Sequence, residues 1–227
     1  MPKQSITRGS KNFKAVIFDL DGTLLDTLED LADSMNRVLK DKGLPAHPTE
    51  AFRYFVGEGA AMLVSRALPP ARRNDELMAD CLEAFRNEYD CNWKVKTRPY
   101  SGVSELLDAL TEKQIEMAVL TNKPQHFAEL CVQEFFSTNK FAVILGQRDG
   151  VPMKPDPAGA LEIAECLNIS PQEFLYLGDT GIDMRTAVQA NMFPVGAMWG
   201  FRSERELRES GAVEIIGRPT DLLKFVN

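Results

Sequence analysis

Two acidic residues follow an apolar run near the start of the chain, and they could do covalent chemistry. Asp19 and Asp21 leave a segment of buried-strand type two residues apart, and Gly22 permits a tight turn after them. A carboxylate can attack an electrophile while a second acid moves protons, so Asp19 is the candidate nucleophile and Asp21 the candidate acid/base. Two like charges this close repel unless a cation lies between them or the two acids share one proton, and the first case implies a hard divalent metal, Mg²⁺.

Three later segments also end in polar groups. Thr121 follows an apolar run, and its hydroxyl and the backbone N–H groups after it suit a phosphoryl oxygen. Lys154 lies between prolines that keep the backbone extended, and its ammonium could neutralise charge on a transferring group. Asp179 ends another apolar run and Asp183 follows four residues later, and both offer the hard oxygen atoms that Mg²⁺ binds.

Each of these residues also has an ordinary structural role. The paired acids could form a polar turn that caps a strand, Thr121 could be a strand-end cap, Lys154 a solvated loop charge and Asp183 a favourable acid at a helix start. Taken singly, these roles are the better interpretation. Taken together, the four sites favour catalysis, because every member follows an expected strand.

Four motifs therefore follow one another along the chain. They are Asp19-x-Asp21-Gly22-Thr23, Thr121-Asn122, Lys154-Pro155 and Gly178-Asp179-x-x-x-Asp183. In this order and spacing they resemble the haloacid dehalogenase superfamily of phosphohydrolases, and most closely its phosphoglycolate phosphatase branch. The resemblance covers nearly the whole chain, from about Phe13 onward.

The resemblance implies a role for each acidic residue. Asp19 would attack the phosphorus of a phosphomonoester and form an aspartyl-phosphate, and Asp21 would protonate the leaving alcohol and then activate water. Mg²⁺ would be held by the side chains of Asp19 and Asp179 and by the backbone carbonyl of Asp21. Asp183 would bind the metal through water or support its ligands, and it could also orient the lysine of the third motif.

The same resemblance implies the groups that bind the substrate. Thr121 and Lys154 are expected to act in catalysis, the first by binding phosphoryl oxygens and the second by offsetting negative charge. The backbone of Asn122 would bind phosphoryl oxygens as well, and Gly22 and Thr23 would belong to the substrate-binding turn.

The spacing of the motifs predicts an α/β fold with an insertion. Between the first two motifs lie roughly ninety-five residues, far more than a simple crossover needs. We expect residues 27–95 to form a helical cap domain, residues 13–26 and 96–227 to form the core, and residues 1–12 to be a flexible tail. In the resembled family such a cap closes over the site and selects the substrate, here about linkers near residues 26–27 and 94–99.

The core should be a three-layer, Rossmann-type parallel sheet with the first strand near its centre, because helical and strand patterns alternate. Apolar spacing predicts cap helices within 28–39, 49–55, 60–68 and 74–93, and core helices near 103–112, 124–136, 157–168, 182–191, 203–210 and 220–226. Ser203 and Glu206 are spaced as a capping box.

Composition narrows the class of protein. With 227 residues and 44% hydrophobic residues the chain can bury a sizeable core, and a net charge of −7 argues against nucleic acid or an anionic membrane as a partner. No apolar run approaches membrane-spanning length. Four cysteines without CxxC spacing are expected to be buried thiols, which favours a cytoplasmic location. The expected partner is a small phosphomonoester, and the protein could be a monomer or a homodimer.

The substrate is the least determined feature. A phosphorylated acid such as 2-phosphoglycolate needs a cation for its carboxylate, and among the basic residues of the insertion we select Arg66, although a solvated helix charge is the more ordinary role. Inorganic pyrophosphate, a sugar phosphate or a phosphosugar mutase reaction would keep the same mechanism.

Two other classes of protein stay open. A signalling receiver could carry a phosphorylated aspartate with Thr, Lys and Mg²⁺. Asp21 argues against this class, because a built-in base would hydrolyse the phosphorylated aspartate that serves as the signal. A catalytically silent interaction protein would usually have lost one of the four motifs, and none is lost.

Overall fold

A six-stranded parallel sheet forms the centre of the computed structural model, which describes residues 13–136 and 140–226. Its strands are β1 (Ala15–Phe18), β4 (Glu116–Pro124), β5 (Val143–Gln147), β6 (Phe174–Gly178), β7 (Phe193–Ala197) and β8 (Glu214–Ile216). They lie in the order β5-β4-β1-β6-β7-β8, and all neighbours are parallel. The prediction that the first strand is central is confirmed. The tail predicted over residues 1–12 lies outside the described residues.

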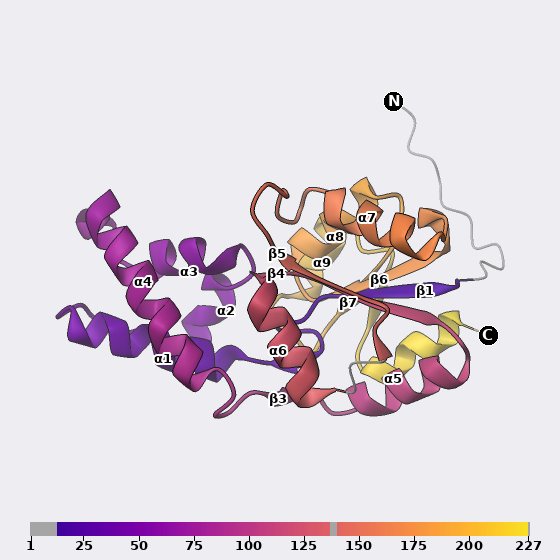
Figure 1. Cartoon of the computed structure of the whole chain (residues 1–227), viewed down its shortest axis with the longest axis horizontal. Coiled ribbons are helices and arrows are strands. Elements are labelled where there is room, and N and C mark those ends of the chain that lie inside the picture. The colour runs from indigo at the N-terminus through magenta and orange to yellow at the C-terminus, as the bar shows by residue number, and fades with distance from the viewer. Residues whose placement is uncertain (1–12, 137–139, 227) are drawn as a thin grey trace.

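Helices cover both faces of this sheet (Figure 1). They are α5 (Val103–Glu112), α6 (Gln125–Phe135), α7 (Ala158–Leu167), α8 (Gly181–Gln189) and α9 (Glu204–Glu209). Val16 and Phe18 of β1 pack in the same apolar cluster as α5 and α6, whereas Ala15 and Ile17 pack with α7 and α8. Because side chains alternate along a strand, a strand covered on both faces is apolar at every position. The predicted three-layer α/β fold is confirmed.

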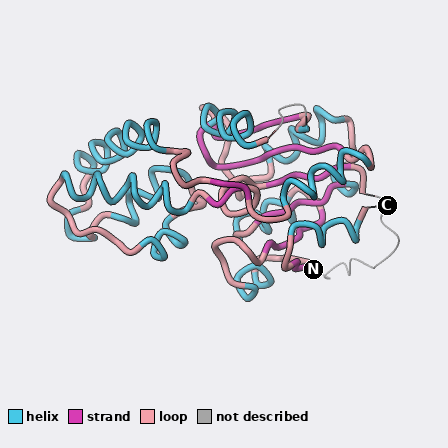
Figure 2. Tube along the Cα trace, turned by 90° about the horizontal axis from the view of Figure 1, so that it is seen from below, coloured by secondary structure: helices cyan, strands magenta, loops and turns pink. Residues whose placement is uncertain are grey.

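A group of helices from one segment lies beyond one end of the sheet (Figures 1 and 2). They are α1 (Leu28–Asp41), α2 (Phe52–Phe55), α3 (Gly59–Ala67) and α4 (Asp75–Asn92), with short 3-10 turns at Thr49–Ala51 and Pro70–Arg72. α1 packs along α4, and the buried side of α1 carries Leu31, Met35 and Leu39. These side chains recur every four residues, so they form one apolar stripe.

Two short strands connect this segment to the core. β2 (Leu25–Asp26) pairs in antiparallel fashion with β3 (Arg98–Pro99), so the two connecting segments run side by side (Figure 2). The sequence predicted linkers here but no pairing between them, because two residues are too few for a strand pattern.

The C-terminal segment is helical where the sequence predicts a helix, near residues 220–226. Pro219–Phe225 form a helix of the 3-10 type, in which the N–H of Asp221 donates to the carbonyl of Arg218. A second 3-10 turn lies at Pro171–Glu173, before β6.

The capping box predicted at Ser203 is only half formed. The Ser203 side chain accepts from the N–H of Glu206, but the Glu206 carboxylate forms an ion pair with Arg202 instead of returning to the start of the helix. A complete capping box occurs at Thr180 and Asp183, at the start of α8.

The prediction that all four cysteines are buried is wrong for two of them. Cys81 and Cys131 are buried, whereas Cys91 and Cys166 are exposed. Cys91 is ten residues after Cys81 on α4, which is not a whole number of helical turns, so the two side chains leave the helix on different faces. Within the described ranges, no helix is long and apolar enough to cross a membrane.

Candidate active site

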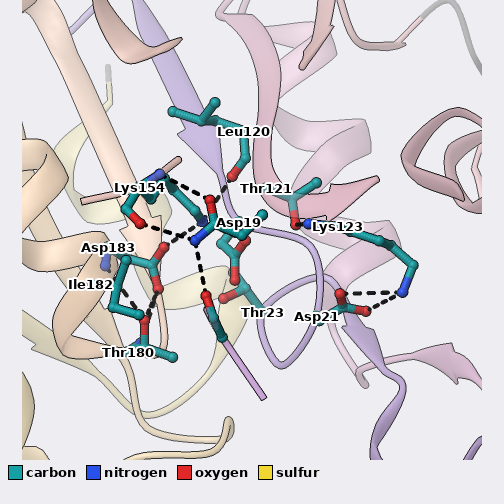
Figure 3. Close-up of polar contacts among 12 residues, drawn as sticks. Asp19, Asp21, Thr23, Leu120, Thr121, Lys123, Lys154, Thr180, Ile182 and Asp183 are labelled. Atoms are coloured by element: carbon teal, nitrogen blue, oxygen red, sulfur yellow. Dashed lines mark hydrogen bonds and ion pairs between the residues drawn. The ribbon is translucent and has the colours of Figure 1, made fainter. Parts of the chain in front are cut away.

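The four motifs meet at the carboxyl ends of three adjacent strands. Asp19 directly follows β1, Thr121 lies near the end of β4, and Asp179 directly follows β6. Because these strands are parallel neighbours, the side chains that follow them gather at one edge of the sheet. Lys154 reaches the same place from the loop between β5 and α7 (Figure 3).

Lys154 is the central cation of the site. Its Nζ lies 2.7 Å from Oδ1 of Asp19, 2.7 Å from Oδ1 of Asp183 and 3.0 Å from the carbonyl oxygen of Leu120. An ammonium has three N–H donors, so these three acceptors use all of them. The Lys154 side chain is 4% exposed, so a buried cation is fixed between the candidate nucleophile and a second acid.

Asp183 is held by the start of α8. Its Oδ2 accepts from the backbone N–H of Thr180 at 3.0 Å and from the Thr180 hydroxyl at 2.6 Å, while Oδ1 faces Lys154. Gly178 is required beside it, since a Cβ atom there would lie 2.3 Å from the Cβ atom of Asp183. These contacts leave Asp183 little freedom, which suits a role in orienting Lys154.

Asp179 is fully buried without an ion-pair partner among the described residues. Its carboxylate accepts from the Thr23 hydroxyl at 3.1 Å and from the backbone N–H of Phe201 at 2.7 Å. Gly22 lies against it with φ of +89°, and a Cβ atom on Gly22 would lie 2.4 Å from Asp179 Oδ2. Only glycine fits this turn, for reasons of both space and backbone conformation.

The three carboxylates fit a divalent metal. One oxygen from each of Asp19, Asp179 and Asp183 lies within 4.8 Å of the others. Burial raises the pKa of Asp19 to about 7, with Lys154 opposing the rise and Asp183 adding to it. Burial, followed by the charges of Asp19 and Asp183, raises the pKa of Asp179 well above its usual range. The cluster therefore holds three carboxylates and one lysine, which contacts two of them, and a hard cation would stabilise the charged forms of all three.

Asp21 lies apart from this cluster, paired with a second buried lysine (Figure 3). Lys123 Nζ is 2.9 Å and 3.2 Å from the two carboxylate oxygens of Asp21, and 2.9 Å from the hydroxyl of Tyr89 on α4. Burial, the largest single influence, lowers the pKa of Lys123, but the charge of Asp21, the nearby Tyr89 and Cys131 and the hydrogen bond to Tyr89 together outweigh it and raise the net pKa well above the usual value. The sequence analysis missed Lys123, although it directly follows the Thr121-Asn122 motif.

The side chain of Asn122, in the second motif, also holds the backbone of Lys154, in the third. The Asn122 side chain accepts from the N–H of Lys154 at 2.9 Å and donates to the Lys154 carbonyl at 3.1 Å. It also donates to the carbonyl of Gly57 in the helical segment, at 3.0 Å. The Thr121 hydroxyl accepts from the N–H of Lys123 at 3.2 Å. Sequence reasoning assigned only the Asn122 backbone, and the structural role of its side chain depends on contacts between distant segments.

A cavity lies between the sheet edge and the helical segment. Asp19, Asp21, Lys123 and Lys154 lie at its polar end, and the opposite walls are mainly apolar. Those walls include Leu31, Val56, Ala60, Leu63, Phe85 and Phe127.

The structure places Arg66 outside this cavity. Its guanidinium forms an ion pair with Glu58 and donates to the carbonyl of Tyr54 at 3.2 Å, so its position gives no support to the prediction that it binds substrate. Arg86 on α4 lines the cavity instead, and no ion pair engages it within the part of the chain that the structure describes. Helical spacing alone could not reveal which arginine of the segment faces the core.

Comparisons with known proteins agree with this geometry. The family model for haloacid dehalogenase-like hydrolases matches residues 16–197. A phosphoglycolate phosphatase of Pseudomonas putida is 35% identical over 198 residues, which cover 86% of this chain and 72% of the relative. One from Mannheimia succiniciproducens is 33% identical over 223 residues, covering 96% of this chain and 100% of the relative. The crystal structure of a predicted phosphoglycolate phosphatase from Haemophilus somnus superposes with a TM-score of 0.87 and 29% identity, covering 96% and 99% of the two chains.

Proposed function

The chain belongs to the haloacid dehalogenase-like hydrolase family, and from that premise we propose that this phosphatase hydrolyses a small phosphorylated acid, 2-phosphoglycolate or a close analogue, through a phosphorylated aspartate. The observation that carries the proposal is the contact of Lys154 with both Asp19 and Asp183 at the sheet edge, beside the buried carboxylate of Asp179. A phosphatase of this kind acts on a small-molecule phosphate substrate.

In the first half of the proposed reaction, a carboxylate oxygen of Asp19 attacks phosphorus and the bond from phosphorus to the ester oxygen breaks. Asp21 gives its proton to the leaving alcohol. The ammonium of Lys154 and the N–H groups that follow Thr121 offset charge on the phosphoryl oxygens.

In the second half, water attacks the phosphorus of the phosphorylated aspartate. Asp21, now ionised, takes a proton from that water, and the bond between phosphorus and Asp19 breaks to release inorganic phosphate. The nucleophile and the acid/base both return to their starting states.

Magnesium is the proposed cofactor; the side chains of Asp19 and Asp179 and the backbone carbonyl of Asp21 would hold it, with Asp183 nearby. Support comes from the buried cluster of three carboxylates with one lysine. When bound, such a cation neutralises charge on the nucleophile and on the phosphoryl group.

The carboxylate of the substrate would be recognised by Arg86. This guanidinium lines the cavity opposite the reacting carboxylates, and it has no competing ion pair in the described ranges. We therefore propose Arg86 in the role that the sequence analysis gave to Arg66.

The helices of residues 27–95 would act as a cap domain over a core formed by residues 13–26 and 96–227. We propose a cytoplasmic enzyme that is a monomer or a homodimer. All four cysteines are free thiols, as expected for a reducing compartment.

An initial-rate panel with Mg²⁺ tests the function. It compares 2-phosphoglycolate, 2-hydroxyethyl phosphate, pyrophosphate, a sugar phosphate and p-nitrophenyl phosphate, for the wild type and for Asp19→Asn and Arg86→Gln. We expect 2-phosphoglycolate to be preferred, EDTA to abolish turnover, and Asp19→Asn to lower kcat by roughly three orders of magnitude or more, because an amide is not an anionic nucleophile. Arg86→Gln should remove the preference for the carboxylated ester over its neutral analogue.

Other outcomes would redirect the proposal. Selective hydrolysis of pyrophosphate or of a sugar phosphate would replace the glycolate assignment. Stable phosphorylation of Asp19 without release of phosphate would favour a receiver-type switch. Turnover by Asp19→Asn at the wild-type rate would exclude this residue as the nucleophile.

A further inference from the structure

Lys123 joins the core, the candidate acid/base and the helical segment at one buried point. It lies in β4, its side chain is 3% exposed, and its Nζ contacts both carboxylate oxygens of Asp21 at 2.9 Å and 3.2 Å. The third contact is the Tyr89 hydroxyl at 2.9 Å. These acceptors match the three N–H donors of an ammonium, so the position of Lys123 is fully determined by its partners.

Tyr89 comes from α4, not from the core. Its ring stacks on Phe85 of the same helix and meets Phe127 of α6 edge to face, with centroids 5.8 Å and 5.1 Å away. The Nζ of Lys123 also lies 4.8 Å from the centroid of the Tyr89 ring, within the range of a cation–π contact. The Tyr89 contact with Lys123 therefore exists only while α4 lies against α6 and β4.

Each of the two reactive carboxylates thus has its own lysine. Lys154 contacts Asp19 and Lys123 contacts Asp21, and all four residues line the same cavity. In an in-line displacement the leaving oxygen departs opposite the nucleophile, and the attacking water later enters on that same side. An acid/base must be held on this side throughout both half-reactions.

We propose that Lys123 is a positioning residue that holds the carboxyl group of Asp21 toward the leaving group, and that the Tyr89 hydroxyl completes this arrangement when α4 is docked on the core. The inference rests on the proposed function. When Asp21 carries the proton, one of its oxygens still accepts from Lys123, while the O–H on the other oxygen faces the leaving oxygen. Lys123 itself neither gives nor takes a proton.

The dependence of rate on the leaving group tests this role. We compare kcat/KM with Mg²⁺ for 2-phosphoglycolate, whose alkyl leaving group needs a proton, and for p-nitrophenyl phosphate, whose leaving group does not. Lys123→Met should lower the value for the alkyl ester by roughly 100-fold or more and that for the aryl ester by less than about tenfold, because general-acid catalysis contributes mainly to poor leaving groups. Lys123→Arg should recover part of the loss.

Tyr89→Phe removes only the hydroxyl and keeps the ring contacts, so it gives a result even if Lys123→Met does not fold. It should lower kcat/KM for the alkyl ester several-fold, and should add no further loss when combined with Lys123→Met. Lys94→Met is the matched control. It removes an exposed ion pair with Glu134, which lies 2.8 Å away on α6, and should leave both esters unaffected.

Equal losses on the two esters would overturn the positioning role and indicate a structural one. Full additivity of Tyr89→Phe and Lys123→Met would overturn the link to α4. Wild-type protein that hydrolyses neither ester would instead contradict the proposed function, and this inference with it.

Discussion

At the scale of single residues, the four acids of the candidate site differ in their partners. Asp19 and Asp183 share Lys154, and Asp21 has Lys123, whereas among the described residues Asp179 accepts only from a hydroxyl and a backbone N–H. A buried carboxylate without a cation is costly, and accordingly the pKa of Asp179 is raised. Asp179 should therefore be the residue that depends most on an added cation.

Asp179→Asn should reduce the stabilisation of the fold by Mg²⁺ without lowering the stability of the metal-free protein. The amide keeps the size of the side chain and removes a buried charge, so without metal the melting temperature should stay the same or rise. Mg²⁺ at about 100 times its Kd should stabilise the wild type by roughly 2.7 kcal/mol and the variant far less. Thermal unfolding with and without Mg²⁺ measures both effects, and Asp33→Asn, an exposed carboxylate on α1, is the control. Equal stabilisation of Asp179→Asn and the wild type by Mg²⁺ would contradict the proposal that Asp179 binds the metal.

At the scale of elements, the connection between the helical segment and the core depends on one buried acid. Asp30, in the first turn of α1, accepts from the backbone N–H groups of Lys96 at 3.0 Å and Thr97 at 2.8 Å, and from the Thr97 hydroxyl at 2.8 Å. These residues precede β3, so Asp30 fixes one connecting segment beside the other. The start of α1 and the paired strands β2 and β3 are therefore tied to one another where the helical segment meets the core.

Asp30→Ala should lower the free energy of unfolding by about 2–4 kcal/mol, because it leaves buried N–H groups without an acceptor. Asp33→Ala is the matched control on the same helix. Its carboxylate lies 2.9 Å from the Lys96 ammonium but is exposed, so the loss should stay below about 1 kcal/mol. Chemical denaturation measures the free energy of unfolding of both variants. Equal losses would show that the buried hydrogen bonds of Asp30 stabilise the protein no more than the exposed ion pair of Asp33.

At the scale of the whole molecule, one arginine pair holds the helical segment against the core. Arg202, which follows β7, donates to the carbonyls of Arg53 and of Val56, the latter at 3.0 Å, and its guanidinium lies 5.4 Å from the ring centroid of Tyr54. Arg53 in turn donates to the carbonyl of Gly200 at 2.8 Å. Together with the hydrogen bond from Asn122 to the carbonyl of Gly57, these bonds connect the core to residues 53–57 of the helical segment.

Arg202→Gln should loosen this edge without unfolding the core. Hydrogen exchange at the amides of residues 53–57 should accelerate by about tenfold, since a hydrogen bond from a charged donor contributes roughly 1.5–3 kcal/mol. Arg205→Gln is the control, because this exposed arginine of α9 pairs only with Glu209 among the described residues. Acceleration spread evenly over the protein, including β1 and β6, would indicate general destabilisation instead.

The sequence by itself predicted which residues of the candidate site lie together. Asp19, Thr121 and Asp179 end or directly follow strand patterns, Lys154 and Asp183 lie in the connections after strands, and parallel strands end at the same edge of a sheet. Strand and helix periodicities are local properties, so they also gave the layered α/β fold and the helical character of the insertion. Those predictions needed no knowledge of long-range contacts.

Only the tertiary structure decided which side chains serve the site from a distance. Arg66 and Arg86 lie on helices whose packing is set by contacts with other segments, so the sequence analysis selected Arg66 and did not consider Arg86, which the structure places at the cavity. Lys123 and Tyr89 are 34 residues apart, and no local pattern indicates that they meet at Asp21. Periodicity records which face of an element is apolar, but the partner of each face is set by how the whole chain packs.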